Sequence, residues 1–213
     1  MNDALAWLIA LPAAYLVGSV PIGIVVGRVT RGVDVRRYGS GATGATNVMR
    51  TLGPVAAVGV LALDWGKGAA VIFIARALSD SALLSATAGV AVLVGHAWPV
   101  FARFKGGKGV ATGLGVLTII SPVAGALALI GFLVALITRY VSVGSMAGAA
   151  TGLTALIVLV ALERLELGYL IFAIGGSLII ELRHRANFMR LLKGTEHRLQ
   201  TSARPRRART REV

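Results

Sequence analysis

The chain has 213 residues, 56% of them hydrophobic, and its mean hydropathy of +0.78 excludes an ordinary water-soluble domain. Cysteine is absent and only 3 histidines are present, which excludes disulfides and thiolate chemistry and argues against a structural zinc site. The net charge is +13, but the basic residues lie between and after apolar segments, so a membrane surface explains them before nucleic acid does. We expect an integral membrane protein that contacts lipids, binds no nucleic acid and needs neither cofactor nor metal.

The first apolar segment covers about residues 4–26. It has Asp3 and no basic residue at its start, which predicts a retained helix and not a cleaved signal. Pro21 predicts a kink near its end. Further spans are predicted at about residues 54–74, 82–94, 146–162 and 168–180.

The apolar stretch from residue 110 to residue 138 is longer than one span needs. Ser121-Pro122 divides it, so we expect two short helices that form a re-entrant or paired hairpin. If both cross, the fold class is an all-α integral membrane protein with about seven transmembrane helices; if neither does, it has five. Either count places the two chain ends on opposite sides.

Basic residues set the orientation. Of the 22 Lys and Arg residues, 19 fall on the side of the C-terminus, whereas Arg76 and Arg164 fall on the other side and Lys67 lies within a span. Cytoplasmic loops carry the excess of Lys and Arg. We therefore expect the N-terminus outside, the C-terminus in the cytoplasm, a single domain over residues 1–199, and a basic, disordered tail over residues 200–213.

The first stretch whose residues indicate a binding site runs from Asp34 to Arg50 and reads DVRRYGSGATGATNVMR. Its glycines tolerate φ > 0, so N–H groups between Ser40 and Thr43 can converge into a nest for an oxyanion. Arginine adds forked donors suited to phosphate. The predicted phosphate ligands are Ser40, Gly41, Thr46, Asn47 and Arg50. The alternative is a flexible loop that faces lipid headgroups, with Arg36 paired only to Asp34.

Asp64 and Lys67 lie three residues apart inside the second span, on one helical face. A charge inside a span is costly and indicates a functional site by default. Two interpretations stay open: a self-neutralising structural pair, or groups in or beside the site.

A second glycine-rich basic stretch, GHAWPVFARFKGGKG, covers residues 95–109. It is not a Walker A loop, because Gly109 stands where Ser or Thr is required and Ala102 where the first glycine is required. Lys105 and Lys108 are predicted phosphate ligands, with interfacial snorkelling cations as the alternative. His96 is a candidate catalytic base, with a histidine that only stabilises the loop as the alternative.

Ser142 and Ser145 are predicted either to bind substrate or to cap the helix that follows. His184 and Asn187 lie three apart, so one helical face presents both. His184 is a second candidate base and, with Asn187, a predicted phosphate ligand; the alternative is two polar groups at a helix end. In the predicted topology the two glycine-rich stretches, the two serines and the His184–Asn187 pair all meet the cytoplasm, and only Asp64 and Lys67 lie near mid-bilayer. This favours a phosphate-bearing ligand at the lipid boundary over a transporter site near mid-bilayer.

The stretches GSGATGATNVMR, GHAWPVFARFKGGKGVAT and ELRHRANFMRLLKGTE resemble, in order, the three motifs of the bacterial acyl-phosphate:glycerol-3-phosphate acyltransferase family. DVRRY and DWGKG also match it, and the resemblance runs from Gly18 to Glu196. One position departs: Ala42 stands where the family commonly has asparagine. Any ligand hydrogen bond of that asparagine is then missing or supplied by Thr43.

The resemblance implies an integral enzyme of the bacterial inner membrane that transfers a fatty acyl group from acyl phosphate to the 1-hydroxyl of sn-glycerol 3-phosphate. We expect it to be a monomer. The products are lysophosphatidic acid and phosphate, in the first step of phospholipid synthesis, and acyl-CoA is not the expected donor. Acyl phosphate is already activated, so no covalent enzyme intermediate is required. The hydroxyl proton goes to His96, His184 or a substrate phosphate oxygen; we favour the phosphate oxygen, because it lies beside the hydroxyl. The alternative function is a small transporter or flippase for a phosphorylated solute.

Overall fold

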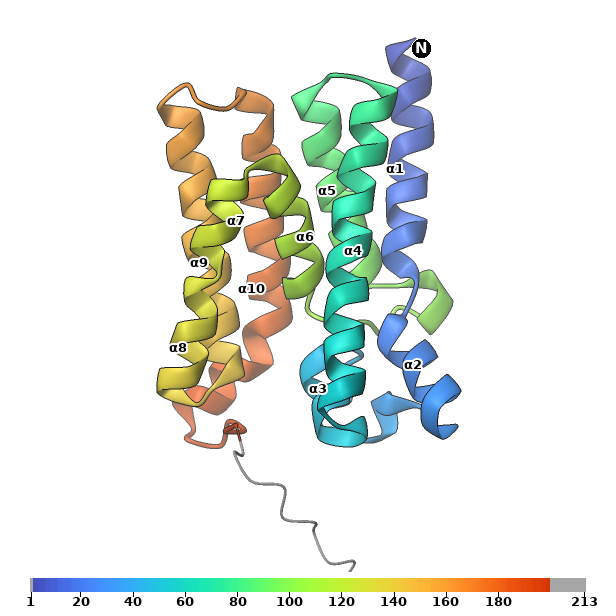
Figure 1. Cartoon of the computed structure of the whole chain (residues 1–213), viewed down its shortest axis with the longest axis vertical. Coiled ribbons are helices and arrows are strands. Elements are labelled where there is room, and N and C mark those ends of the chain that lie inside the picture. The colour runs from blue at the N-terminus through green and yellow to red at the C-terminus, as the bar shows by residue number, and fades with distance from the viewer. Residues whose placement is uncertain (1, 200–213) are drawn as a thin grey trace, which may run out of the picture.

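The computed structural model describes residues 2–199, which form helices and turns without a strand (Figure 1). The α-helices are α1 (Asp3–Ser19), α2 (Ile22–Arg31), α3 (Ala45–Leu52), α4 (Pro54–Leu78), α5 (Ala82–Ala97), α6 (Val110–Ile120), α7 (Pro122–Ala128), α8 (Ile130–Thr138), α9 (Val141–Ala161) and α10 (Leu170–Leu192). Three short 3-10 turns are η1 (Val35–Arg37), η2 (Val100–Ala102) and η3 (Leu167–Tyr169). The all-helical prediction is confirmed, and the predicted tail lies outside the described residues.

Within residues 2–199, 5 helical segments are long and apolar enough to cross a membrane. They are Asp3–Arg31, Pro54–Leu78, Ala82–Ala102, Val141–Ala161 and Leu167–Leu192. These segments coincide with the five long spans expected from the sequence. The count of seven crossings stays a prediction that depends on the stretch between α5 and α9.

The first span is broken where Pro21 predicts a kink. α1 ends at Ser19 and α2 begins at Ile22, because proline cannot donate to the helical ladder. The break exposes carbonyl groups at the end of α1, and Lys67 Nζ donates to Gly18 O and Val20 O at 3.1 and 3.3 Å. A buried lysine from α4 thus caps α1 inside the bundle.

The stretch after α5 forms the paired hairpin predicted at Ser121-Pro122. α6 has 11 residues and rises about 16 Å, half of a hydrocarbon core of about 30 Å. Ser121 Oγ accepts from Ala124 N at 3.2 Å and so caps α7. In Figure 1, α6 runs up the bundle and α7 with α8 runs back to the end where α9 begins.

Two predicted connections are more helical than expected. The glycine-rich stretch from Asp34 to Arg50 was predicted without a helix, but it contains η1 and most of α3. The predicted start of the next span, at about residue 146, is also wrong, because α9 begins at Val141. Arg139 adopts φ +62, a left-handed conformation that reverses the chain within one residue. Ser142 and Ser145 therefore lie inside α9 and are not its N-cap, which is Tyr140.

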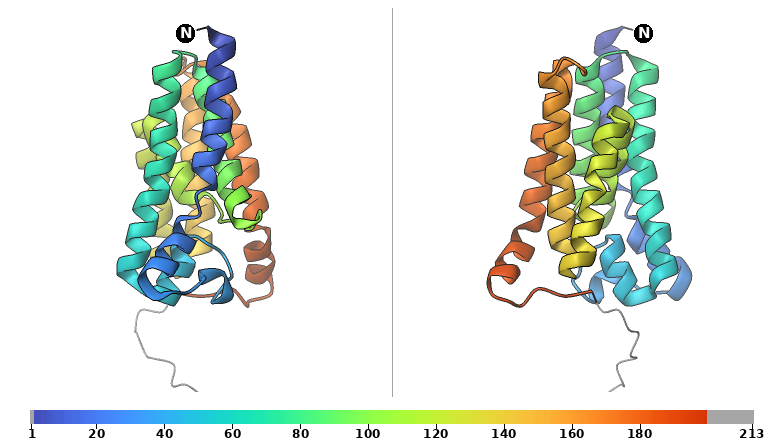
Figure 2. Two further views of the ribbon diagram at one scale, coloured as in Figure 1. Left: turned by 90° about the vertical axis from the view of Figure 1, so that its right-hand side faces the viewer. Right: turned by 60° about the vertical axis from the view of Figure 1, so that its left-hand side comes forward.

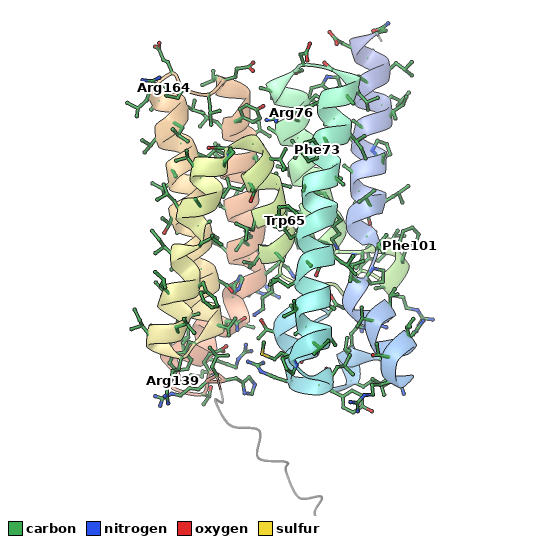
Figure 3. The ribbon with its side chains drawn as sticks, viewed as in Figure 1. Trp65, Phe73, Arg76, Phe101, Arg139 and Arg164 are labelled. Carbon is green, nitrogen blue, oxygen red and sulfur yellow. The ribbon has the colours of Figure 1, made fainter. Side chains whose placement is uncertain are left out.

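Polar segments gather at one end of the bundle, which we call the polar end. It comprises α2, η1, α3, the start of α9 and the end of α10, whereas the N-terminus lies at the other end (Figures 1 and 2). Figure 3 shows Arg139 at the polar end and both Arg76 and Arg164 at the opposite end. The first and last predicted polar stretches thus lie at one end, whereas Phe101, in the second glycine-rich stretch, lies further along the bundle (Figure 3). That this end faces the cytoplasm stays a prediction.

Close packing of α4 on α6 places the polar residues of α4 beside the start of α6. A Cβ atom on Gly68 would overlap Thr112 O, and a Cβ atom on Gly115 would overlap Trp65 O. These glycines let the two backbones approach as small residues do in membrane helices. On the other side, α5, α9 and α10 share a core that includes Leu93, Leu156 and Phe172.

Candidate active site

A cavity of about 220 Å³ lies at the polar end, among α3, α6, α9 and α10. Ten of the predicted site residues line it: Ser40, Thr46, Asn47, Arg50, His96, Lys108, Ser142, Ser145, His184 and Asn187. Asp64, Arg190 and Glu196 also line it. Residues from four separate stretches of the sequence therefore face one space.

Two predicted ligands, Lys105 and Gly41, do not line this cavity. Lys105 is exposed and closes the turn after η2, where Arg103 and Phe104 adopt positive φ angles of 55 and 59. That turn directs the chain away from the cavity before it returns at Lys108. Gly41 is exposed, with φ +72, and its N–H donates to Tyr38 O at 3.1 Å.

Asn47 organises the first glycine-rich loop. Its Oδ1 accepts from Ser40 N at 2.8 Å, and its Nδ2 donates to Val35 O at 2.9 Å and Ala42 O at 2.8 Å. Both amide hydrogens are used within the chain, so Asn47 shapes the loop even though it borders the cavity. The N–H groups of Ser40 and Gly41 are also engaged, so the predicted oxyanion nest cannot use them. Of the predicted nest, only the N–H groups of Ala42 and Thr43 are left for a ligand, because Asn47 and Tyr38 accept from the other two.

Ala42 itself lines the cavity, at the position where the family commonly has asparagine. Thr43 does not line it; its side chain is buried beneath the loop, near Asp64 and Lys67. The structure thus gives Thr43 no position from which to replace the missing amide.

Arg36 and Asp34 form the ion pair that was one of the predicted alternatives. Arg36 Nη2 lies 2.7 Å from Asp34 Oδ2, and this hydrogen-bonded pairing lowers the pKa of Asp34 to about 2. Arg36 Nη1 also donates to Ala102 O at 3.0 Å. The pair therefore joins the first basic stretch to η2 and holds the two glycine-rich segments together.

Asp64 both pairs with Lys67 and lies beside the site, so the structure supports the two interpretations together. Lys67 Nζ lies 2.8 Å from Asp64 Oδ1, so the two charges neutralise each other inside the bundle. Asp64 Oδ1 also lies 3.5 Å from His96 Nδ1, and Thr112 Oγ1 lies 3.2 Å from the same nitrogen. The His96 ring is held between α4 and α6. This geometry supports the alternative in which His96 stabilises the second glycine-rich loop, whose Gly107 N–H donates to His96 O at 3.1 Å.

His184 is buried and differently arranged. Its Nδ1 lies 2.8 Å from Ile180 O. Because a carbonyl oxygen only accepts, Nδ1 carries the hydrogen and Nε2 of the neutral ring is left as an acceptor. His184 is therefore the histidine better prepared to accept a hydrogen bond from a hydroxyl group in the cavity.

Glu196 is the functional candidate that sequence reasoning missed. Its side chain is only 4% exposed, and its carboxylate accepts from Ser142 Oγ at 3.0 Å, Asn187 Nδ2 at 2.7 Å and Arg190 Nε at 2.8 Å. Burial opposes its charge, but the hydrogen bonds from Asn187, Arg190 and Ser142 outweigh burial and lower its pKa. The helical spacing from Asn187 to Arg190 was a signal that could have extended the predicted set.

Positive charge dominates the rest of the cavity wall, where Arg50 and Lys108 join Arg190. Burial lowers the pKa of Lys108 to about 8, and the neighbouring Arg190, Arg50 and Arg183 act in the same direction against the opposing effect of Glu196. The start of α6 adds further donors. Within residues 2–199, the N–H groups from Lys108 to Ala111 donate to no backbone carbonyl, and these residues line the cavity. A helix N-terminus with free N–H groups favours a phosphate.

An apolar cavity of about 270 Å³ adjoins the polar one. The two share five lining residues: Leu61, Val110, Leu114, Val141 and Ser145. The apolar cavity continues between α6, α8, α9 and α10, where Leu117, Phe132, Leu153 and Phe172 line it. A ligand with an anionic head and a hydrocarbon chain fits this combination.

Curated relatives and solved structures resemble this chain over most of its length. The glycerol-3-phosphate acyltransferase of Thermoanaerobacter sp. (strain X514) is 42% identical over 189 residues, covering 87% of this chain and 92% of the relative. The glycerol-3-phosphate acyltransferase of Desulforudis audaxviator (strain MP104C) is 43% identical over 197 residues, covering 92% and 97%.

Two crystal structures of PlsY, an integral membrane glycerol 3-phosphate acyltransferase, are similar to this fold. The glycerol 3-phosphate form has a TM-score of 0.84 and the lysophosphatidic acid form 0.82. Each is 39% identical in sequence and covers 92% of this chain and 96% of that chain. The family model for glycerol-3-phosphate acyltransferase matches residues 8–194. These matches favour the predicted acyltransferase over the predicted transporter, and the chain belongs to the glycerol-3-phosphate acyltransferase family.

Proposed function

We propose that this protein transfers a fatty acyl group from acyl phosphate to the 1-hydroxyl of sn-glycerol 3-phosphate, giving lysophosphatidic acid and inorganic phosphate. The observation that carries this proposal is the joined pair of cavities. The polar cavity offers Arg50, Lys108 and Arg190 to phosphate groups, and the apolar cavity beside it accepts an acyl chain. Both substrates carry phosphate, so a strongly cationic space is needed to bring them together.

In this reaction the 1-hydroxyl oxygen attacks the acyl carbon, and the bond from that carbon to the phosphate oxygen breaks. The electron pair leaves with the phosphate, and the hydroxyl proton is transferred to a phosphate oxygen. No group from the protein is consumed. The protein holds the reactants in contact and stabilises the negative charge that develops at the acyl oxygen and the leaving phosphate.

The site residues divide into three roles in this proposal. Arg50, Lys108 and the start of α6 bind phosphate, with Ser40, Thr46 and Ser145 supplying further contacts at the cavity wall. His184 Nε2 accepts a hydrogen bond from the 2-hydroxyl of glycerol 3-phosphate and so orients this substrate, which leaves the hydrogen of the attacking 1-hydroxyl for the phosphate oxygen. Asn47 and His96 hold the two glycine-rich loops in place.

We also propose that the protein lies in the inner membrane of a bacterial cell and that its polar end faces the cytoplasm. The support for this orientation is the distribution of Lys and Arg in the sequence, with Arg139 at the polar end and Arg76 and Arg164 at the other among the residues that the structure describes. The chain has no cysteine, so single cysteines report accessibility without background. We expect a cysteine in place of Arg164 to react with an impermeant thiol reagent in intact cells, and one in place of Arg139 to react only after the membrane is opened.

Phosphate release by purified protein in detergent tests the activity. Acyl phosphate with glycerol 3-phosphate should release phosphate and form lysophosphatidic acid, whereas acyl-CoA with glycerol 3-phosphate should not react. A transporter would release no phosphate without a membrane compartment. If lysophosphatidic acid formed with acyl-CoA but not with acyl phosphate, acyl phosphate would be rejected as the donor.

A further inference from the structure

Arg183 of α10 binds the second glycine-rich loop from a distance of 76 residues in the sequence. Its Nε donates to Gly107 O at 2.9 Å, and its Nη2 donates to Gly106 O at 3.0 Å. The guanidinium lies 5.7 Å from the centroid of the Trp98 ring, a cation–π distance. Arg183 is not among the residues that line the polar cavity, so it acts on the loop and not on a ligand.

The two carbonyl groups bound by Arg183 fix the direction of the N–H groups that follow them. In a trans peptide the C=O and the N–H point in opposite directions, and residues 2–199 contain no cis peptide. The N–H of Gly107 lies opposite Gly106 O and donates to His96 O at 3.1 Å. The N–H of Lys108 lies opposite Gly107 O and therefore points away from Arg183. Lys108 and Gly109 are also the residues through which the loop joins the wall of the polar cavity.

We propose that Arg183 is a positioning residue: it holds the peptide between Gly107 and Lys108 so that the Lys108 N–H faces a substrate phosphate. This inference rests on the proposed function of the cavity. The fork of a guanidinium suits two neighbouring carbonyl groups, whereas a lysine ammonium is a point charge that cannot hold both in one plane. Arg183→Lys therefore keeps the charge and loses the orientation.

The test compares Arg183→Lys and Arg183→Gln with Arg185→Gln, which changes an exposed arginine on the same helix. Steady-state kinetics give kcat and the KM of each substrate, and titration calorimetry gives the Kd of inorganic phosphate without turnover. We expect Arg183→Lys to raise the KM of the phosphate substrate at the start of α6, and the Kd of phosphate, by about tenfold to a hundredfold. We expect kcat and the melting temperature to stay close to wild type, and Arg185→Gln to change none of these values.

The inference is overturned if Arg183→Lys leaves both KM values and the Kd of phosphate within about twofold of wild type. It is also overturned if kcat and melting temperature fall while the Kd is unchanged, since that is the pattern of a purely structural contact. Should Arg183→Gln not fold, Arg183→Lys carries the test. If wild type and Arg185→Gln show no turnover, the proposed function fails, but the calorimetric comparison still decides the role of Arg183.

Discussion

The side-chain amide of Asn187 donates to the carboxylate of Glu196 at 2.7 Å, inside a cavity that Arg50, Lys108 and Arg190 also line. Ser142 and Arg190 donate to the same carboxylate. Glu196 thus ties the segment after α10 to α9 and α10. It also provides a negative charge among positive groups while no phosphate is bound.

Glu196→Ala should destabilise the protein. Three donors lose a buried charged acceptor, so we expect the free energy of unfolding to fall by about 2–3 kcal/mol. Denaturant titration of the protein in mixed detergent measures the change. Glu181→Ala, on an exposed part of α10, is the control and should change little. Equal stability of the two variants would contradict the role given to Glu196.

Lys108 should make phosphate binding depend on pH. Its pKa is lowered to about 8, so the ammonium is charged below that pH and becomes neutral above it. We expect kcat/KM for glycerol 3-phosphate to fall as pH rises through this value, since kcat/KM reports groups of the free enzyme. Bound phosphate favours the charged ammonium, so the fall in kcat should begin at a higher pH. Lys108→Arg keeps its charge in this range and should remove the alkaline fall.

Lys105 gives the matched control for this experiment. It belongs to the same loop, is exposed and does not line the cavity. Lys105→Ala should leave the pH profile and the KM of glycerol 3-phosphate as in wild type. A large rise in KM would return Lys105 to the set of phosphate ligands.

His184→Ala should lower kcat by less than about a hundredfold, because a substrate phosphate oxygen and not the imidazole takes the proton. His96→Ala should chiefly lower stability, since its ring lies between Asp64 and Thr112. The exposed His197→Ala is the control. Loss of all turnover in both His96→Ala and His184→Ala, with glycerol 3-phosphate binding unchanged, would show that the proton goes to histidine.

Gly39→Ala should disrupt the first glycine-rich loop. Gly39 adopts φ +58, and a Cβ atom there would overlap Asn47 Oδ1, the acceptor that holds Ser40 N. We expect a loss of about 2 kcal/mol of stability and a raised KM for a phosphate substrate. Gly59→Ala is the control, because its Cβ would meet nothing within 4 Å and alanine favours the helix. Similar behaviour of the two variants would argue against this constraint.

Ala149→Phe should shift the acyl-chain preference toward shorter chains. Ala149 lines the apolar cavity one helical turn beyond Ser145, where the two cavities meet. A ring at this position occupies the space for the far part of a chain. Competition between long and short acyl phosphates, read as the ratio of kcat/KM values, measures the shift. Ala150→Phe, at an exposed position on α9, should keep the wild-type ratio.

Periodicity, proline positions and charge were sufficient to predict the long helices and the gathering of the polar stretches. Pro21 and Ser121-Pro122 predicted both breaks in the bundle because proline acts locally. The start of α9 could not be predicted from polarity, since Ser142 and Ser145 look like loop residues and are helical. A single left-handed residue, Arg139, decided that boundary.

The sequence predicted which residues line the site better than it predicted the role of each residue. Asn47 reads as a ligand from its type, but only the folded loop shows that its amide hydrogens are already used. Lys105 and Lys108 look equivalent in sequence, and the turn between η2 and α6 separates them. Glu196 was missed because a carboxylate repels phosphate, and only the fold shows the donors that hold it beside the site.

The shared wall of the two cavities has a consequence for the fate of the product. In the proposed orientation, a molecule made there has its head at the aqueous boundary and its tail at the depth of neighbouring lipids. We expect it to diffuse sideways into the surrounding leaflet without passing through water, while inorganic phosphate dissolves in the opposite direction. Partitioning of the two products into different solvents would then oppose the reverse reaction, with no separate release machinery.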